Sequence, residues 1–393
     1  MTAGEKIRVL VADDSAFMRK VLLGILGADG GFEIVGEARD GREAVAQSSK
    51  LRPQVITMDI NMPYMDGVEA TEAIMSTEPR PIVIVSSESR AGATATLRAL
   101  DLGAIDFVAK PSTAIDLDMS SVRDELVRKL RTAAKVRVVR NLVRKAPANA
   151  AAKVSAEPAI SETASVAAPS PNPAAPAAGV TQARPQAPSN GARLPIAVLA
   201  ASTGGPATLM KLIPEFPADF PAALLVVQHM PGSFTAQFAE QLAGVSKIPV
   251  KQAENGETLR AGHAYVCPGD CHLRVAPGTA SAPRIVLDDG PRIAGYRPSI
   301  DVTLESVAML AGGNSVAAIL TGMGNDGARG AQAIQENGGL VLAQDEETSV
   351  IFGMPSEAIR TGAVHHVLPL EQIAGAVNRR MTFYAGTNGR AGA

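Results

Sequence analysis

Short apolar runs alternate with helix-periodic segments through the first third of the chain. Five of these runs are typical of buried strands, at residues 7–12, 32–37, 55–58, 82–85 and 104–109. Apolar residues recur at helical spacing between them, so the segment consists of repeated strand-helix units. Five such units in so short a span predict a parallel, doubly wound α/β sheet of five strands.

The same alternation returns in the second half, from about residue 193. Apolar runs predict strands at residues 194–201, 222–228, 316–320, 340–343 and 364–368, with helical patterns between most of them. Residues 250–287 break the rhythm with short strands and Pro-Gly turns, which predicts a hairpin-bearing insertion near the edge of the sheet. The pattern therefore predicts a second, larger, doubly wound α/β domain.

The two predicted domains are separated by a stretch of different composition. Residues 122–145 carry nine lysines or arginines against Asp124 and Glu125. This favours a solvated last helix that leads into a linker over a helix that touches nucleic acid or an anionic surface. Ala, Pro and Ser dominate residues 146–192, with too few large apolar side chains to offset the entropy of ordering. We expect domains at 1–134 and 193–385, a flexible linker at 135–192 and a disordered tail at 386–393.

Composition narrows the class of protein. The 393 residues are 46% hydrophobic, enough for a large core, and the formal net charge of −2 argues against nucleic-acid binding by overall electrostatics. The sequence shows neither a secretory apolar segment at its start nor an apolar run long enough to span a bilayer. We therefore expect a cytoplasmic protein that is not inserted in a membrane. Its two cysteines, Cys267 and Cys271, exclude a disulfide framework.

Polar side chains follow four strands of the first predicted sheet, at the edge where parallel sheets bind ligands. Asp13 and Asp14 follow the first strand, Asp59 the third, Ser86 the fourth and Lys110 the fifth. Three carboxylates in one place repel each other unless a cation is present, and oxygen ligands suit Mg²⁺. A lysine and a hydroxyl facing them could hold a phosphoryl group. Solvated loop carboxylates are the alternative, and their joint placement at several strand ends argues against it.

The segments at 11–15, 58–67 and 106–111 are similar to the motifs of two-component receiver domains, which have a flavodoxin-like fold. The resemblance implies that Asp59 is the phosphoacceptor and attacks the phosphohistidine of a sensor histidine kinase. An aspartyl phosphate is a covalent intermediate of the carboxylate type. The other roles that the resemblance implies are Mg²⁺ binding by Asp13, Asp14, Asp59 and the Asn61 carbonyl, phosphoryl contact by Lys110, and sensing of the phosphorylated state by Ser86 and Phe107.

Ser202 lies on a predicted strand-to-helix turn in the second domain. Two glycines follow at 204 and 205, so the backbone can turn sharply and approach a ligand, and Pro206 suits the first turn of a helix. Such a turn places a serine hydroxyl beside free N–H groups, as an acyl-transfer site requires. A serine N-cap on a glycine-rich turn is the alternative.

His229 and Asp326 each follow another predicted strand of the second domain. If that sheet is parallel, both project from the same edge as Ser202, and the three can act as nucleophile, general base and orienting acid. Taken singly, His229 could be structural and Asp326 a helix N-cap, but three placements on one edge favour catalysis. The chain order and the missing G-x-S-x-G elbow argue against an α/β-hydrolase.

The stretches at 201–205, 228–230 and 321–327, after a receiver and a linker, resemble the chemotaxis response-regulator protein-glutamate methylesterase family. This implies hydrolysis of γ-glutamyl methyl esters on methyl-accepting chemotaxis receptors, with release of methanol, and deamidation of particular receptor glutamines. Attack by Ser202 on an ester or an amide builds the same oxyanion, which the Met323 N–H or one near Thr203 could stabilise. No cofactor besides Mg²⁺ is expected.

Three other interpretations stay open. A zinc site could use H-x₃-C-x₃-C-H, although this spacing lies outside the zinc-finger pattern and the Cys-to-Cys stretch is typical of a turn. A signalling adaptor with an inactive second domain is opposed by the presence of serine, histidine and aspartate together. A DNA-binding regulator has only the basic stretch 122–145 in its favour. The zinc ligands would be His263, Cys267, Cys271 and His272.

Overall fold

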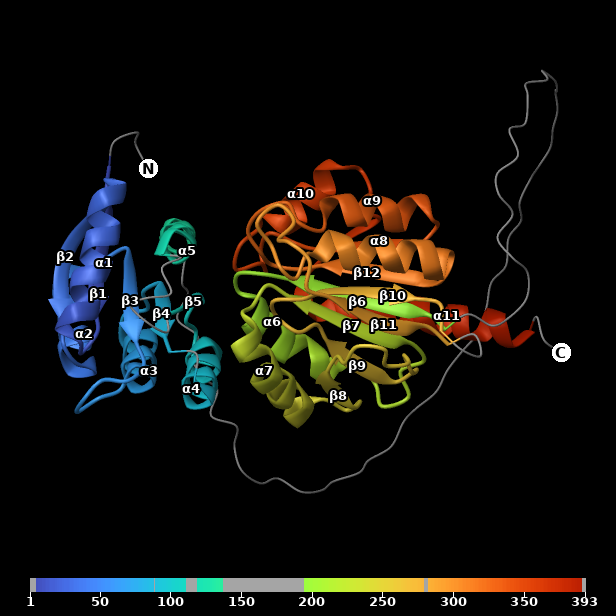
Figure 1. The fold of residues 1–393 in the computed structure, drawn as a ribbon, viewed down its shortest axis with the longest axis horizontal. Helices are drawn as coiled ribbons and strands as arrows, with labels where there is room; N and C mark the ends of the chain where they lie inside the picture. Colours follow the sequence, from blue (N-terminus) through green and yellow to red (C-terminus); the bar gives the residue numbers. More distant parts are fainter. Residues whose placement is uncertain (1–4, 88, 111–118, 137–193, 279–281, 391–393) are drawn as a thin grey trace, which may run out of the picture. The chain divides into compact units, whose positions relative to one another are not determined.

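The computed structural model describes residues 5–87, 89–110, 119–136, 194–278 and 282–390 (Figure 1). The expected linker at 135–192 therefore falls almost wholly outside the described residues. Within the described residues, no helix is both long and apolar enough to cross a membrane.

The N-terminal part is a five-stranded sheet in the order β2-β1-β3-β4-β5, and every pair of neighbours is parallel. This confirms the predicted doubly wound sheet. Its strands are β1 (Ile7–Ala12), β2 (Phe32–Ala38), β3 (Val55–Asp59), β4 (Ile82–Ser86) and β5 (Asp106–Ala109). Its helices are α1 (Ala16–Asp29), α2 (Gly41–Leu51), α3 (Gly67–Thr77), α4 (Arg90–Asp101) and α5 (Met119–Ala133).

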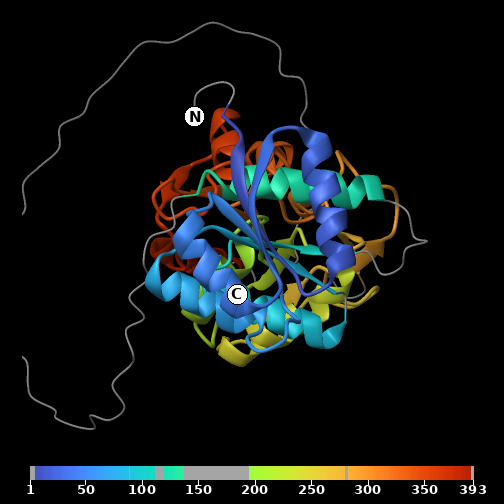
Figure 2. The same cartoon turned by 90° about the vertical axis from the view of Figure 1, so that its left-hand side faces the viewer.

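The helices cover both faces of this sheet, with α1 and α5 on one side and α2, α3 and α4 on the other (Figure 2). Alternate residues of β1 serve the two cores. Val9 and Val11 pack with Leu22 of α1 and Leu126 of α5, and Leu10 belongs to the opposite core. Burial on both faces explains why the strands are continuous apolar runs and do not alternate with polar residues.

Local chemistry fixes the loop that follows β3. Asp66 and Glu69 form a capping box at the start of α3, with hydrogen bonds of 2.8 and 3.2 Å. A Cβ atom at Gly67 would lie 1.9 Å from the carbonyl oxygen of Asp59, so only glycine allows the helix to start this close to the strand. The side chain at the end of β3 is thereby held at the edge of the sheet.

The C-terminal part contains a seven-stranded sheet in the order β14-β13-β12-β6-β7-β9-β8, again with all neighbours parallel. Its strands are β6 (Ile196–Ala201), β7 (Ala223–Gln228), β8 (Val250–Gln252), β9 (His263–Val266), β12 (Ser315–Ile319), β13 (Leu340–Gln344) and β14 (His366–Leu368). Strands β10 (His272–Ala276) and β11 (Arg284–Asp288) form a separate antiparallel pair.

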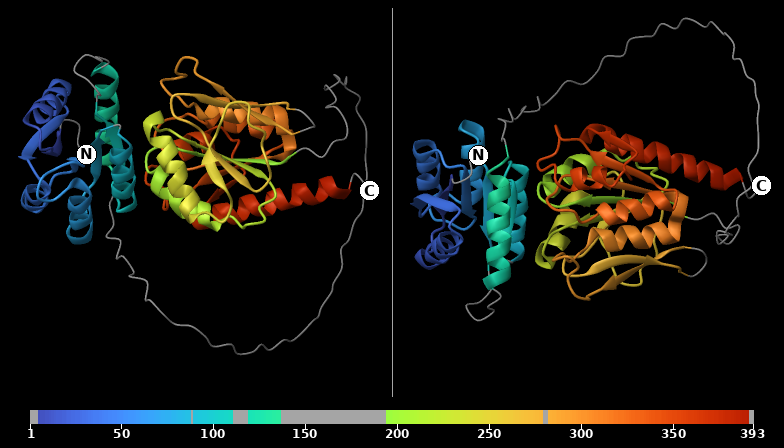
Figure 3. Two further views of the ribbon diagram at one scale, coloured as in Figure 1. Left: turned by 60° about the horizontal axis from the view of Figure 1, so that its bottom comes forward. Right: turned by 90° about the horizontal axis from the view of Figure 1, so that it is seen from above.

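Helices cover both faces of the second sheet as well. Figure 1 shows α8, α9 and α10 over one face and α6 and α7 over the other. The β10–β11 pair packs against α8, and the long α11 runs along the opposite face (Figure 3). The helical segments are α6 (Gly205–Leu212), η1 (Ile213–Glu215), α7 (Gly232–Val245), α8 (Ile300–Ala311), η3 (Gly312–Asn314), α9 (Ala328–Glu336), α10 (Met354–Arg360) and α11 (Leu370–Arg390).

Two expectations about this domain need correction. The segment at 250–287 does contain a hairpin, but β8 and β9 are not part of it, because they extend the main sheet beyond β7. The helix α11 continues to Arg390, past the boundary expected at residue 385. Its buried residues Val377, Met381 and Tyr384 anchor the helix, and extending an existing helix costs less than starting one.

Candidate active site

Ser202 lies directly after β6, on the turn into α6, and is 6% exposed. Its N–H donates to the carbonyl of Thr321 at 3.0 Å, and its own carbonyl accepts from Gly205 at 2.8 Å. Gly204 has a φ of 77°, and a Cβ at Gly205 would lie 1.9 Å from the Gln228 amide oxygen. The turn therefore needs both glycines. The residue at the N-cap of α6 is Gly204, so the alternative reading of Ser202 as a helix cap is wrong.

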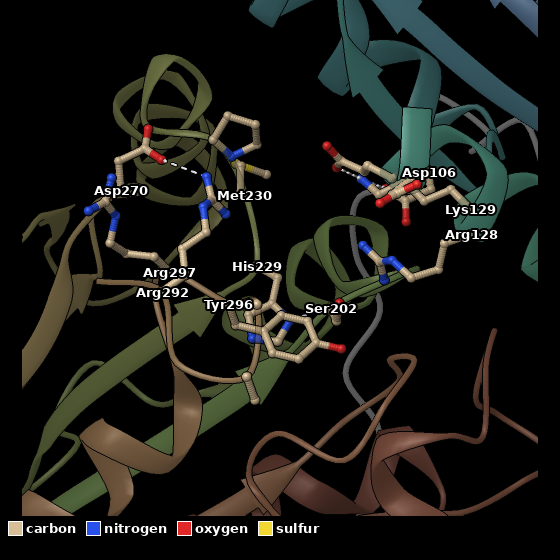
Figure 4. Close-up of a pocket in the computed structure, with 15 residues that line it drawn as sticks. Asp106, Arg128, Lys129, Ser202, His229, Met230, Asp270, Arg292, Tyr296 and Arg297 are labelled. Carbon is tan, nitrogen blue, oxygen red and sulfur yellow. Dashed lines mark hydrogen bonds and ion pairs between the residues drawn. The ribbon is translucent and has the colours of Figure 1, made fainter. Parts of the chain in front are cut away.

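His229 follows β7 and contacts both other members of the predicted triad. Figure 4 shows its ring beside Ser202. Its Nδ1 lies 3.0 Å from Ser202 Oγ, and its Nε2 lies 2.8 Å from Asp326 Oδ2. The carboxylate can only accept, so Nε2 carries the proton and Nδ1 presents its lone pair to the serine hydroxyl. In this geometry the nitrogen that can take the serine proton is Nδ1.

Asp326 is 5% exposed and accepts several hydrogen bonds besides the one from His229. Ile300 N–H donates to it at 2.7 Å, Asp301 N–H at 3.0 Å and Ser299 Oγ at 3.0 Å. Burial alone would raise the pKa of Asp326. The hydrogen bond and charge of His229, together with the N–H groups of Asp301 and Ile300, outweigh burial and lower that pKa below its usual value. The carboxylate is therefore charged at neutral pH.

The N-cap alternative for Asp326 is half right. The carboxylate does cap a helix, but it caps α8, and not α9, which follows it in sequence. The N-terminus of α9 is served by Asp301 of α8, whose Oδ1 accepts from Gly327 N–H at 2.9 Å and Gly330 N–H at 2.7 Å. The loop before α9 thus supplies the acceptor for α8, and α8 supplies the acceptor for α9, which fixes the position of Asp326 in the site.

The two candidate oxyanion donors flank the nucleophile. Thr203 is the next residue, and Met323 lies on the loop after β12 that touches the serine turn. A Cβ at Gly322 would lie 2.9 Å from Ser202 Cβ, which shows how closely these loops approach. In the part of the chain that the structure describes, the N–H groups of Thr203 and Met323 donate to no protein acceptor. Both are therefore available to a developing oxyanion.

Two groups in the site were not expected from the sequence. The ring of Tyr296 stacks on His229 with centroids 4.3 Å apart and planes 14° apart. The buried Gln228 donates to the carbonyls of Ser202 and His229 at 2.8 and 3.0 Å, which connects the two loops that carry these residues. The sequence could have pointed to Gln228, because an amide side chain at the end of a buried strand, next to His229, needs hydrogen-bond partners. Tyr296 stands in an irregular stretch without periodicity or motif, so nothing marked it.

The first sheet brings Asp13, Asp14, Asp59 and Lys110 together as predicted. Ligand oxygens of the three carboxylates lie within 4.8 Å of one another. The Lys110 ammonium lies 2.9 Å from Asp13 Oδ2 and 2.9 Å from Asp59 Oδ2. Burial raises the pKa of Asp59 despite Lys110, and the charge of Asp13 raises it further.

These residues fit a divalent cation. Among the described residues, the buried Asp59 Oδ1 has no hydrogen-bond partner, which is an unusual state for a carboxylate oxygen and suits a metal ligand. Asp13 is fully buried and Asp14 is exposed. Asn61 is exposed in the loop that follows β3, whereas Ser86 and Phe107 are buried on β4 and β5.

The zinc alternative gains no support from the geometry. His272 uses both ring nitrogens, at 3.1 Å from Ser299 N–H and at 3.1 Å from the Pro291 carbonyl. His263 Nδ1 faces the Ala261 carbonyl at 3.0 Å. Burial raises the pKa of Cys267, which disfavours the thiolate that binds zinc. Among the described residues, Asp13, Asp14 and Asp59 form the one group of His, Cys, Asp or Glu close enough to share a metal.

Comparison with known proteins covers both domains. Residues 197–377 match the family described as CheB methylesterase, and residues 9–120 match the response regulator receiver domain. A protein-glutamate methylesterase/protein-glutamine glutaminase of Pyrococcus horikoshii is 44% identical over 94% of this chain and 92% of its own length. The protein of the same description from Symbiobacterium thermophilum is 44% identical over 95% of this chain and 96% of its own. The solved CheB methylesterase catalytic domain of Thermotoga maritima is 41% identical, with 47% of this chain and 98% of that chain covered and a TM-score of 0.46.

Proposed function

This chain belongs to the protein-glutamate methylesterase/protein-glutamine glutaminase family, and from that premise we propose that Ser202, His229 and Asp326 hydrolyse γ-glutamyl methyl esters and deamidate glutamines of methyl-accepting chemotaxis receptors. The proposal rests on the continuous hydrogen-bonded chain through His229. Its Nδ1 lies 3.0 Å from Ser202 Oγ, and its Nε2 lies 2.8 Å from the buried Asp326 Oδ2.

The proposed reaction proceeds through an acyl-enzyme. Ser202 Oγ attacks the substrate carbonyl while Nδ1 of His229 takes the hydroxyl proton, and the Asp326 carboxylate stabilises the imidazolium that forms. The N–H groups of Thr203 and Met323 stabilise the tetrahedral oxyanion. The imidazolium gives its proton to the methoxy oxygen, which leaves as methanol, or to the nitrogen of an amide, which leaves as ammonia, as the bond to the acyl carbon breaks. A water molecule, deprotonated by the same nitrogen, then attacks the acyl carbon and releases the glutamate side chain.

We propose that the N-terminal sheet is a receiver domain of residues 1–134 that accepts a phosphoryl group on Asp59 from a sensor histidine kinase. An oxygen of Asp59 attacks phosphorus as the bond to the histidine nitrogen breaks, and Lys110 holds the phosphoryl oxygens. Asp13, Asp14, Asp59 and Asn61 would hold Mg²⁺, which supplies positive charge against the carboxylates and the phosphoryl group. Ser86 and Phe107 would respond to the phosphoryl group.

The substrates and the place of action follow from the same proposal. We propose that the enzyme acts in the cytoplasm on these receptors and is not itself inserted in the membrane. Nucleic acid has no part in it. The catalytic domain begins near residue 193, and it needs no metal, because its nucleophile, base and oxyanion donors are all protein groups.

Methanol release from methylated receptor membranes tests the proposal. The wild-type chain should release methanol, and more of it in the presence of Mg²⁺ and a small-molecule phosphodonor. The Ser202→Ala variant should release none above background. A wild-type protein that binds these membranes but releases no methanol would show that the second domain is an adaptor. A Ser202→Ala variant as fast as wild type would show that another nucleophile acts.

A further inference from the structure

The segment from Pro291 to Asp301 reaches two members of the triad at once. Its end supplies the donors at Ser299, Ile300 and Asp301 that hold the Asp326 carboxylate. Its middle places Tyr296 on the face of His229. We propose that Tyr296 is a positioning residue for His229, which keeps the imidazole plane aligned with its two partners and stabilises its protonated form. This proposal rests on the serine hydrolase mechanism proposed above.

The stack is tight enough to control the ring. The two rings are nearly parallel, with planes 14° apart and centroids 4.3 Å apart (Figure 4). The imidazole nitrogens bind Ser202 Oγ and Asp326 Oδ2, and the contact from Nδ1 to Ser202 is lost when the serine oxygen bonds to the substrate. At that stage a single hydrogen bond, from Nε2 to Asp326, would leave the ring free to tilt. A flat aromatic face against it opposes this tilt.

The same face acts on the charge of the ring. His229 becomes an imidazolium when it takes the serine proton, and the electron-rich face of a phenol attracts a cation held above it. This attraction exists only while the proton is on the histidine, so it stabilises the transition state more than the resting enzyme. An interaction of this kind raises kcat and leaves substrate binding unchanged.

Tyr296 is itself held firmly enough to serve as a support. Its N–H and carbonyl pair with those of Ile293 at 2.9 and 3.0 Å, so the segment forms a closed turn. The next residue, Arg297, donates from Nη1 to the carbonyls of Asp289 and Gly290 at 2.8 and 3.0 Å. Two residues further, Ser299 N–H donates to the buried ring of His272 at 3.1 Å.

The phenol also reaches the loop that carries Met323. A Cβ atom at Gly324 would lie 2.4 Å from the Tyr296 hydroxyl, and this glycine has a φ of 94°. Any other residue at 324 would therefore displace the tyrosine as well as strain its own backbone. The hydroxyl end of the side chain therefore lies against the loop from Gly322 to Asp326, while the ring faces the imidazole.

A simpler role for Tyr296 would be to contact the bound substrate. Kinetic measurements distinguish this role from the support of His229. Loss of a substrate contact raises KM and leaves kcat unchanged, whereas loss of a support for the base lowers kcat. The ring, and not the hydroxyl, performs the proposed function. A phenylalanine should therefore replace tyrosine, and an aliphatic side chain should not.

The test compares Tyr296→Phe, Tyr296→Leu and Tyr296→Met with a control, Phe383→Leu, which removes an exposed aromatic ring from α11. We expect Tyr296→Leu and Tyr296→Met to lower kcat for methanol release roughly 10- to 100-fold with KM unchanged, as for a misplaced catalytic group. Tyr296→Phe and Phe383→Leu should keep wild-type kcat. Unchanged kcat in both aliphatic variants, a change in KM alone, or equal damage from Tyr296→Phe would overturn the proposal. Thermal unfolding of each variant excludes loss of fold as the cause.

Two further measurements do not depend on the receptor substrate. The rate at which a fluorophosphonate labels Ser202 requires the base, so it should fall in both aliphatic variants and not in Tyr296→Phe. The five histidines of the chain allow the His229 ring protons to be identified by their loss in a His229→Gln spectrum. Those signals should move downfield in the aliphatic variants, because the ring current of Tyr296 is gone. If wild type labels with the probe but releases no methanol, the proposed substrate is wrong, and the labelling rates still decide the role of Tyr296.

Discussion

Replacement of Asp326 by asparagine tests the geometry of the triad most directly. The carboxylate receives His229 Nε2 and Ile300 N–H at Oδ2, and Ser299 Oγ and Asp301 N–H at Oδ1. Asparagine has one oxygen and one NH₂ group, so its NH₂ must face one of these two sets of donors. Both orientations leave at least one backbone N–H opposite another donor, and both remove the negative charge.

The two orientations harm catalysis by different routes. If the NH₂ faces His229, it donates to Nε2, the proton moves to Nδ1, and the lone pair that should accept from Ser202 is lost. If the oxygen faces His229, the ring keeps its tautomer but its protonated form loses a carboxylate 2.8 Å away. At an effective dielectric constant of about 20, that attraction is worth roughly 4–6 kcal/mol. We therefore expect kcat to fall roughly 10³- to 10⁴-fold, with residual activity above background from the serine and the oxyanion donors.

Methanol release under saturating substrate measures the loss, with Asp219→Asn as a matched control at an exposed aspartate of the same domain. The variant should also be less stable than wild type. Because the pKa of Asp326 is lowered in the folded state, its charged form stabilises the fold above the ordinary carboxyl pKa, and this stabilisation disappears as the pH falls through the lowered value. The difference in unfolding free energy should thus be constant at neutral pH and shrink in acid. An Asp326→Asn enzyme within tenfold of wild type would refute this account of the base.

Three other outcomes are expected. Ser202→Ala should abolish methanol release without unfolding the protein. The double variant Ser202→Ala/His229→Ala should release methanol little more slowly than either single variant, because the two residues act as a unit. A much slower double variant would contradict this. Mg²⁺ should raise the melting temperature of wild type more than that of Asp59→Asn, since the buried charge of Asp59 is destabilising without a cation. Equal shifts in melting temperature would show that Asp59 is not a metal ligand. On the same receptor membranes, the fragment 194–393 should exceed the basal rate of the unphosphorylated full chain. The Ala- and Pro-rich composition of residues 146–192 predicts a linker that transmits no strain, so we expect regulation by direct contact, most simply by occlusion of the active site. A fragment no faster than the full chain would exclude occlusion and leave activation by the phosphorylated receiver.

The strands and the triad were predictable because each leaves a local signal. Strand β6 is buried along its whole length, so it is one apolar run, and Ser202 follows that run at once. The parallel order then places every residue that follows a central strand at one edge, which is how His229 joins Ser202. By contrast, β8 and β9 are too short to show a period, and their place beside β7 depends on a crossover that no local pattern reveals.

The residues that support the triad could not be found in this way. Ile300 and Asp301 contribute backbone N–H groups, which every residue except proline has, so their identity carries no information. Tyr296 acts through a contact across the domain, and its neighbours along the chain are glycine, arginine and proline without period. The sequence therefore identified the three residues of the proposed triad, which the structure brings together, but not the groups that hold them in place.

The exchange of caps at the starts of α8 and α9 acts together with His229 to keep the buried carboxylate of Asp326 charged at this edge. An isolated carboxylate in such a place would take up a proton, and it could then no longer hold the proton of His229 towards itself. Here the N-terminus of α8 offers two N–H groups and the positive end of its dipole to Asp326. Asp301 in turn binds the N-terminus of α9, one residue beyond Asp326, and fixes the loop from the other side. These two helix ends meet only in the folded domain, and there they help to keep Asp326 charged and in place beside His229. The position of Asp326 after the serine and the histidine in the chain order therefore does not prevent it from completing the site.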